Sequence, residues 1–286
     1  MGGDATRVDY AGDLPQCCES TQLRLPRPDD AVFEVKGKFG HSEAWCAGLE
    51  EWHVRIGVSW EGDDEQTLLG TVEQHSRESD PESLLVAHGV SIDEDRYAWV
   101  GEVALVVTRL DVPVGRDREV LSDGRDLWMA ADAIAEDLGR LATPLAASGD
   151  EDFDGWSSAV HEAWPNAFGT DAVILLRSAR VTPVLRGHLL GAWACAQAVD
   201  LFDHGSTLVA AEAAPLQWRD AHSGIHPDQL SLSPDDSKVW QAEQTRLAKH
   251  LHKHLGLAPL PGHPSILTWH TTYRNDAFTS TLDLWR

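Results

Sequence analysis

Seven residues between two apolar segments have the composition of an anion-binding turn. They are Arg186, Gly187, His188, Leu189, Leu190, Gly191 and Ala192. The segment before them is rich in β-branched residues, as in a buried strand, and a long apolar helix is predicted directly after them. A glycine-bearing turn at a helix start leaves backbone N–H groups without acceptors, and the helix dipole favours negative charge there. The pattern favours a site for phosphate oxygens, and it is also typical of a tight turn that packs a helix on a sheet.

Glu212 is the one carboxylate in an apolar segment, LVAAEAAPL, that is predicted to be a buried strand. A buried carboxylate is costly unless it is paired or takes part in chemistry. We therefore take Glu212 as a candidate general base, with a structural hydrogen-bonding role as the alternative.

Three histidines, His250, His252 and His254, lie near the end of a predicted helix. On a helix only His250 and His254 share a flank, because they are four residues apart. No HExxH motif accompanies them, so we predict no metal site. His252 lies on the other side of the apolar stripe of this helix, apart from its neighbours.

Apolar periodicity predicts the elements that must position these residues. A buried strand at 172–181 leads through the turn into the apolar helix, and a second buried strand follows at 206–214. A helix at 234–255 begins with Ser233 as its cap and ends at Gly256. The other predicted strands are 31–36, 54–60, 68–75, 84–90, 100–110, 266–272 and 277–285, and the other predicted helices are 126–147 and 157–168. This order predicts an α/β fold (an α+β mixed sheet).

The chain divides into three predicted parts. Residues 1–30 form a polar N-terminal arm, residues 31–150 form a sheet-plus-helix half rich in strands, and residues 151–286 form a half that carries the turn. The acidic segment 148–155 is the predicted boundary between the two halves.

Composition narrows the function classes. The 286 residues are 42% hydrophobic with a net charge of −23, which argues against binding nucleic acid through a basic surface and fits a cationic partner or simple solubility. The four cysteines form no CxxC motif, and Cys195 is predicted to be a core residue. No apolar run is long enough to span a membrane, so we predict a cytoplasmic protein without membrane contact.

Residues 181–191 resemble motif A of the GNAT N-acetyltransferases, V-x-P-x-x-R-G-x-G-x-G. Val181, Pro183, Arg186, Gly187 and Gly191 match in register, and Leu189 replaces the middle glycine.

A second family pattern, N-x-x-A-x-x-L-Y-x-x-x-G-F, falls at the end of the 234–255 helix. Ala248, Leu251 and Gly256 match it, while Thr245, His252 and Leu257 replace the Asn, Tyr and Phe. Together the two motifs make residues 171–285 similar to the GNAT superfamily.

The resemblance implies a GNAT-like fold with an enlarged N-terminal half, and a reaction. Acetyl-CoA, or another acyl-CoA, would bind where the fourth and fifth strands of the family splay. Its pyrophosphate would lie on the turn from Arg186 to Ala192, and its pantetheine arm along Ala179 to Val181. The acyl group would pass to an amine of a cationic small molecule or protein. His252 occupies the position of the family's acidic tyrosine, and Glu212 is the nearest substitute for its basic glutamate.

The rival interpretation is a catalytically inactive GNAT-like module that binds a ligand or a protein. Three departures favour it: Leu189 in the turn, the absence of a glutamate in strand 172–181, and the change from tyrosine to His252. A metal-dependent hydrolase is a weaker third hypothesis.

Overall fold

The computed structural model describes residues 31–39, 49–59, 90–92, 97–110, 124–147, 155–165, 169–182, 189–203, 205–215 and 233–284. The strands are β1 (Ala31–Phe39), β2 (Leu49–Ser59), β3 (Ser91–Ile92), β4 (Tyr97–Arg109), β5 (Ala172–Val181), β6 (Thr207–Glu212), β7 (Ala258–Leu260) and β8 (His263–His270). The helices are α3 (Gly124–Ile134), α4 (Glu136–Ala142), α5 (Ser158–Ala163), α6 (Leu190–Phe202), α8 (Pro234–Leu255) and α9 (Asp276–Leu282). The predicted arm 1–30 and the predicted strand 68–75 lie outside the described residues, as does 84–90 apart from Val90.

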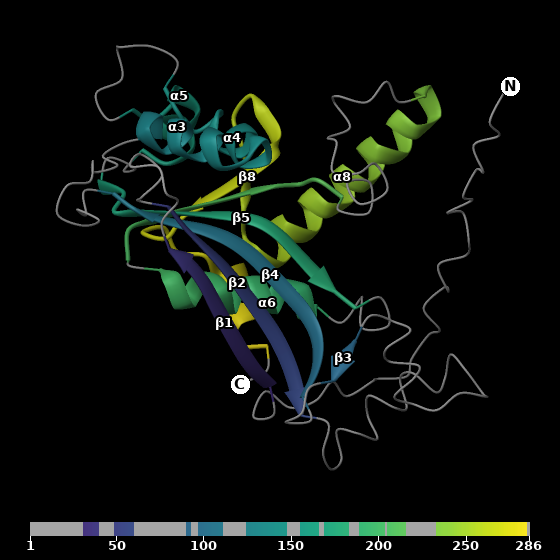
Figure 1. The fold of residues 1–286 in the computed structure, drawn as a ribbon. Helices are drawn as coiled ribbons and strands as arrows, with labels where there is room; N and C mark the ends of the chain where they lie inside the picture. Colours follow the sequence, from purple (N-terminus) through teal and green to yellow (C-terminus); the bar gives the residue numbers. More distant parts are fainter. Residues whose placement is uncertain are drawn as a thin grey trace, which may run out of the picture.

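These strands form one mixed sheet in the order β1-β2-β4-β5-β6-β8-β7, with β3 paired to β4 (Figure 1). β5 and β6 are parallel, and the other pairs are antiparallel. The prediction of an α/β architecture with a mixed sheet is confirmed. Because β4 pairs with β5, the sheet is continuous across the acidic segment 148–155.

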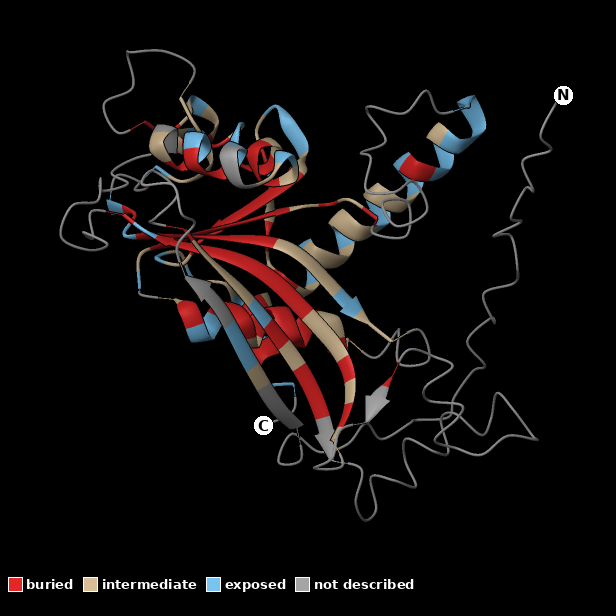
Figure 2. Ribbon diagram, viewed as in Figure 1, coloured by how far each residue is buried: buried red, intermediate tan, exposed pale blue. Residues whose placement is uncertain are grey.

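Helices cover both faces of the sheet, and the side chains of β5 alternate between them. Ile174 and Leu176 pack in a core with α6, α8 and α9, on what we call the α6 face. Val173 and Leu175 pack in a second core with α3, α4 and α5, on the α4 face. Figure 2 shows buried residues concentrated in β4, β5 and α6. A strand that is buried on both faces consists of a continuous run of apolar residues. This run allowed the bounds of β5 to be predicted correctly from the sequence.

Helix α8 begins and ends where its capping residues predict. The Ser233 hydroxyl accepts the N–H of Asp236, and Gly256 ends the helix in the left-handed region with φ 65°. A Cβ on Gly256 would overlap the side chain of Asn275. Asn275 in turn donates to the Leu255 carbonyl and caps α9, so it joins the end of α8 to the start of α9.

The segment 126–147, predicted as one helix, is two helices. Ala135 is extended (φ −162°, ψ 139°) between α3 and α4. The chain doubles back at this point, and Gly139 of α4 packs against Asp132 of α3, where a Cβ would clash. The apolar stripe persists across the break because both helices pack on the same core.

The prediction of a strand at 277–285 is wrong. It contains helix α9, because Asn275 caps it and Phe278, Thr281 and Leu282 are buried at helical spacing. The strand predicted at 266–272 is β8, which begins at His263, and β7 precedes it in a hairpin that periodicity did not reveal because β7 is three residues long.

No helix among the described residues combines the length and the apolar character needed to cross a bilayer.

His270, at the end of β8, is fully buried as a neutral imidazole. Its Nδ1 accepts the Thr272 N–H at 3.4 Å and lies 2.8 Å from the Thr272 hydroxyl, so the proton is on Nε2, which is 3.1 Å from the Thr170 hydroxyl. Burial lowers the pKa of His270 because it disfavours the charged form, while the carboxylates of Asp203 and Asp171 act in the opposite direction.

The free energy of unfolding should therefore fall as the pH drops below about 6.5, the ordinary pKa of histidine. Below that pH the unfolded chain binds a proton at this position that the folded chain does not, and each pH unit of separation is worth about 1.4 kcal/mol. Urea unfolding of wild type and His270→Gln at pH 5.5 and 7.5 measures the effect. The variant should lose less stability over this range, and equal losses would contradict the prediction.

Candidate functional site

The parallel ladder between β5 and β6 ends before either strand does. It runs from the pair Ala172–Thr207 to the pair Leu176–Ala211. Beyond it, β5 continues to Val181 alongside β4, and β6 continues to Glu212 alongside β8 (Figure 1). We call this place, where the two strands separate, the β5–β6 parting.

A β-bulge in β5 marks the start of the parting. Leu176 pairs with Leu105 and Ser178 with Ala104, so Arg177 is the extra residue. Leu176 faces α6, whereas the Arg177 side chain reaches α4. After the bulge, Ala179 and Val181 pack against the α6-face core. Arg177 follows Val173 and Leu175 on the α4 face, and the bulge shifts the alternation after it, so that Ala179 and Val181 face α6.

Arg177 is held by carboxylates from two other elements. Its Nε lies 2.8 Å from Asp137 Oδ2 and its Nη2 3.1 Å from Asp137 Oδ1, and its Nη1 lies 3.7 Å from Glu51 Oε1 of β2. The hydrogen bonds to Asp137 raise the pKa of Arg177. The side chains of Asp137 and Glu51 are 11% and 17% exposed, so this ion pair is largely shielded from water.

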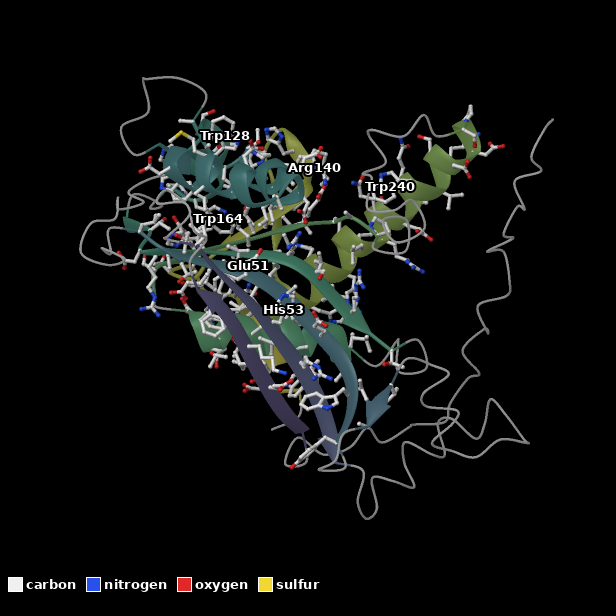
Figure 3. All side chains as sticks on the ribbon, viewed as in Figure 1. Glu51, His53, Trp128, Arg140, Trp164 and Trp240 are labelled. Carbon is white, nitrogen blue, oxygen red and sulfur yellow. The ribbon has the colours of Figure 1, made fainter. Side chains whose placement is uncertain are left out.

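Glu212 lies on the same face, across the parting. Leu208 and Ala210 of β6 belong to the α4-face core, and alternation places Glu212 with them. Its carboxylate, 18% exposed, is 3.9 Å from Nη2 of Arg140 in α4. The expectation that this half-buried carboxylate needs a partner is met. Figure 3 shows Arg140 on α4 together with Glu51 and His53 on β2.

On the α6 face, the start of α6 lies against the end of β5. A Cβ on Gly191 would come within 3.2 Å of Val181 Cγ2. Leu189 precedes the helix in the left-handed region (φ 62°, ψ 6°) and is the only non-glycine residue with positive φ among those described. The first intrahelical bond runs from Trp193 N–H to the Leu189 carbonyl, so the N–H groups of Leu190, Gly191 and Ala192 have no acceptor within the helix.

The structure thus brings together six of the predicted cofactor residues. Ala179, Val181, Leu189, Leu190, Gly191 and Ala192 lie at the end of β5 and the start of α6. Arg186, Gly187 and His188 lie outside the described residues.

His252 is exposed in the last turn of α8, with its Nδ1 3.0 Å from the carbonyl of Leu257. Because a carbonyl only accepts, the neutral ring carries its proton on Nδ1 and presents a lone pair at Nε2. Neutral His252 can therefore act as a base at Nε2, whereas the acid role implied by the resemblance requires the protonated ring. The part of the chain that the structure describes holds no cluster of three or more His, Cys, Asp or Glu residues arranged for a metal ion.

Glu212 and His252 lie on opposite faces of the sheet and do not form a pair. Leu251 and Leu255 of α8 pack on the α6 face, whereas Glu212 points toward α4. The sequence did not point to Asp137, Arg140 and Glu51, because no local pattern links them to Arg177 or Glu212. The available signal was Arg177, a charge within an apolar strand that needs a buried partner.

No family model, curated protein or solved structure matches this chain.

Replacing Leu189 tests the backbone strain at the start of α6. A non-glycine residue in the left-handed region costs about 1–2 kcal/mol, which outweighs the entropic cost of glycine, about 0.5–1 kcal/mol. We expect Leu189→Gly to be more stable than Leu189→Ala by about 1 kcal/mol in denaturant unfolding. The two variants differ only by the Cβ methyl group, so their difference reports mainly on the backbone conformation. The reverse order would show that φ is not strained here.

Proposed function

We propose that the protein is a GNAT-type N-acyltransferase that binds acetyl-CoA, or another acyl-CoA, at the β5–β6 parting. The observation that carries the proposal is the separation of two parallel strands directly before the start of α6. The resemblance places the cofactor between such strands, and the motif residues Val181 and Gly191 are in contact there.

The described residues fit this cofactor. The N–H groups of Leu190, Gly191 and Ala192 lack helical acceptors, and they lie at the positive end of the α6 dipole, which suits a pyrophosphate. The β5–β6 ladder ends at Leu176, so the following residues of β5 can extend along the pantetheine arm. When bound, the cofactor supplies the thioester that an amine attacks.

The charges at the parting favour a cationic acceptor. Glu51, Asp137 and Glu212 carry three negative charges, and Arg140 and Arg177 carry two positive charges, so the cluster has a net charge of −1. In the proposed reaction Glu212 would take the proton that the neutral amine loses as its nitrogen bonds to the acyl carbon, and CoA would leave as its thiolate. His252, on the opposite face, occupies the position of the family's acid, and in its protonated form it would give a proton to the leaving thiolate.

A catalytically inactive ligand-binding module is the second candidate. It is favoured by the placement of Glu212 and His252 on opposite faces, and by the engagement of Glu212 with Arg140. In this case the protein binds an acyl-CoA or a related anion without transfer.

Calorimetry with acetyl-CoA and CoA tests the binding site. Arg186→Glu should weaken binding about tenfold, because it replaces a cation beside the expected pyrophosphate position with an anion. Arg274→Glu, at an exposed arginine outside the site, is the matched control and should leave the affinity unchanged. Absence of binding to wild type at millimolar cofactor would exclude the proposed function.

Thiol release with a panel of amines tests catalysis. Glu212→Gln keeps the shape of the side chain and removes its basicity, so we expect kcat to fall about 100-fold. Unchanged kcat would remove Glu212 from the reaction. Cofactor binding without turnover of any amine would favour the binding module.

A further inference from the structure

We propose that α4 is a clamp that fixes the width of the β5–β6 parting, with Asp137 and Arg140 as positioning residues. Asp137 holds Arg177 of β5, and Arg140 holds Glu212 of β6. Only the assignment of a cofactor to the parting rests on the proposed function; the clamp itself rests on the contacts.

The register of the strands places both contacts at the same level. The last ladder pair is Leu176–Ala211, and the clamped residues Arg177 and Glu212 are the next residue on each strand. The clamp therefore contacts each strand at the first residue beyond the ladder that joins β5 to β6.

The spacing of the helix matches this position. Asp137 and Arg140 are three residues apart, so their Cβ atoms lie about 5–6 Å apart on one face of α4. Hydrogen-bonded neighbouring strands lie about 4.8 Å apart. The two anchors on α4 are therefore spaced about as far apart as neighbouring strands, so one helix face can contact both strands.

Helix α4 is itself firmly attached to the sheet. Leu138 and Leu141 are buried in the α4-face core, and Gly139 packs against α3. These residues lie between and beside Asp137 and Arg140. The packed core therefore supports the contacts that these two residues make with the strands.

The two contacts differ in strength. Arg177 donates two hydrogen bonds to Asp137, at 2.8 and 3.1 Å. In the other contact, Nη2 of Arg140 lies 3.9 Å from Oε2 of Glu212, which is beyond hydrogen-bond distance. The Nε of Arg140 is buried and has no hydrogen-bond partner among the residues that the structure describes. An unsatisfied buried donor is costly, so Arg140 gains energy when an acceptor approaches. The contact with β5 is therefore the stronger of the two, and the contact with β6 is the weaker.

Hydrogen exchange of the protein without ligand tests the clamp. In Asp137→Asn and in Arg140→Gln, we expect the amides of 178–181 and 213 to exchange at least tenfold faster, with the ladder amides of 173–175 unchanged. Lys238→Gln, an exposed change on α8, is the control and should have no effect. The charge-swapped double variant, Arg140→Glu with Glu212→Arg, should restore slow exchange.

Unchanged exchange at 178–181 and 213 in the single variants would overturn the clamp. Equal acceleration in the ladder and beyond it would also overturn it, because that pattern reports general destabilisation. If a single variant fails to fold, the charge-swapped variant decides: slow exchange supports the clamp, and fast exchange at 178–181 and 213 rejects it.

Calorimetry separates this inference from the proposed function. If wild type binds acetyl-CoA, Arg140→Gln should weaken that binding about tenfold, and Lys238→Gln should not. Equal affinity of wild type and Arg140→Gln would show that the clamp does not position the cofactor. If wild type does not bind acetyl-CoA, the proposed function fails, and the exchange result alone decides whether α4 controls the parting.

Discussion

Hydrogen bonding between β5 and β6 stops at Leu176 and Ala211, although both strands continue. A central strand that leaves one neighbour must remain supported by the other. Strand β4 provides this support, because its pairing with β5 continues past the bulge at Arg177 up to Val181. The position of α6 against Val181 and the ion pairs of α4 both depend on this separation.

The two faces of the parting have different chemistry. On the α6 face there are backbone N–H groups and apolar side chains, and on the α4 face there is a cluster of five charged side chains. A helix start suits an anion, and a cluster with excess negative charge suits a cation. In the proposed function, the cofactor and the amine acceptor would therefore approach from opposite faces and meet between the strands.

Local signals were enough to predict the elements at the centre of this site. The apolar run of β5, and the Ser233 and Gly256 caps of α8, gave the correct bounds because burial and capping act within a few residues. Tertiary packing decided the rest. The extended Ala135 depends on how α3 and α4 pack, and α9 depends on Asn275, which also holds the end of α8.

The charged cluster could be predicted only in part. Glu212 was recognisable as a carboxylate in an apolar strand, but its partner Arg140 comes from a helix far away in the sequence. Asp137 lies beside the apolar stripe of its helix and would be solvated on an isolated helix. Its side chain is only 11% exposed because α4 packs on the sheet where Arg177 follows Val173 and Leu175 on the same face.

The pairing of β4 with β5 has a consequence for dissecting the chain. β4 and β5 are bonded along most of their length, and the acidic segment 148–155 lies between them in the sequence. A fragment cut at that segment would present β4, which is buried in the intact sheet, as a long apolar edge with unpaired backbone groups. Such edges template association with other strands. The two halves are thus expected to precipitate or co-assemble when expressed separately, so studies of either half require the intact chain.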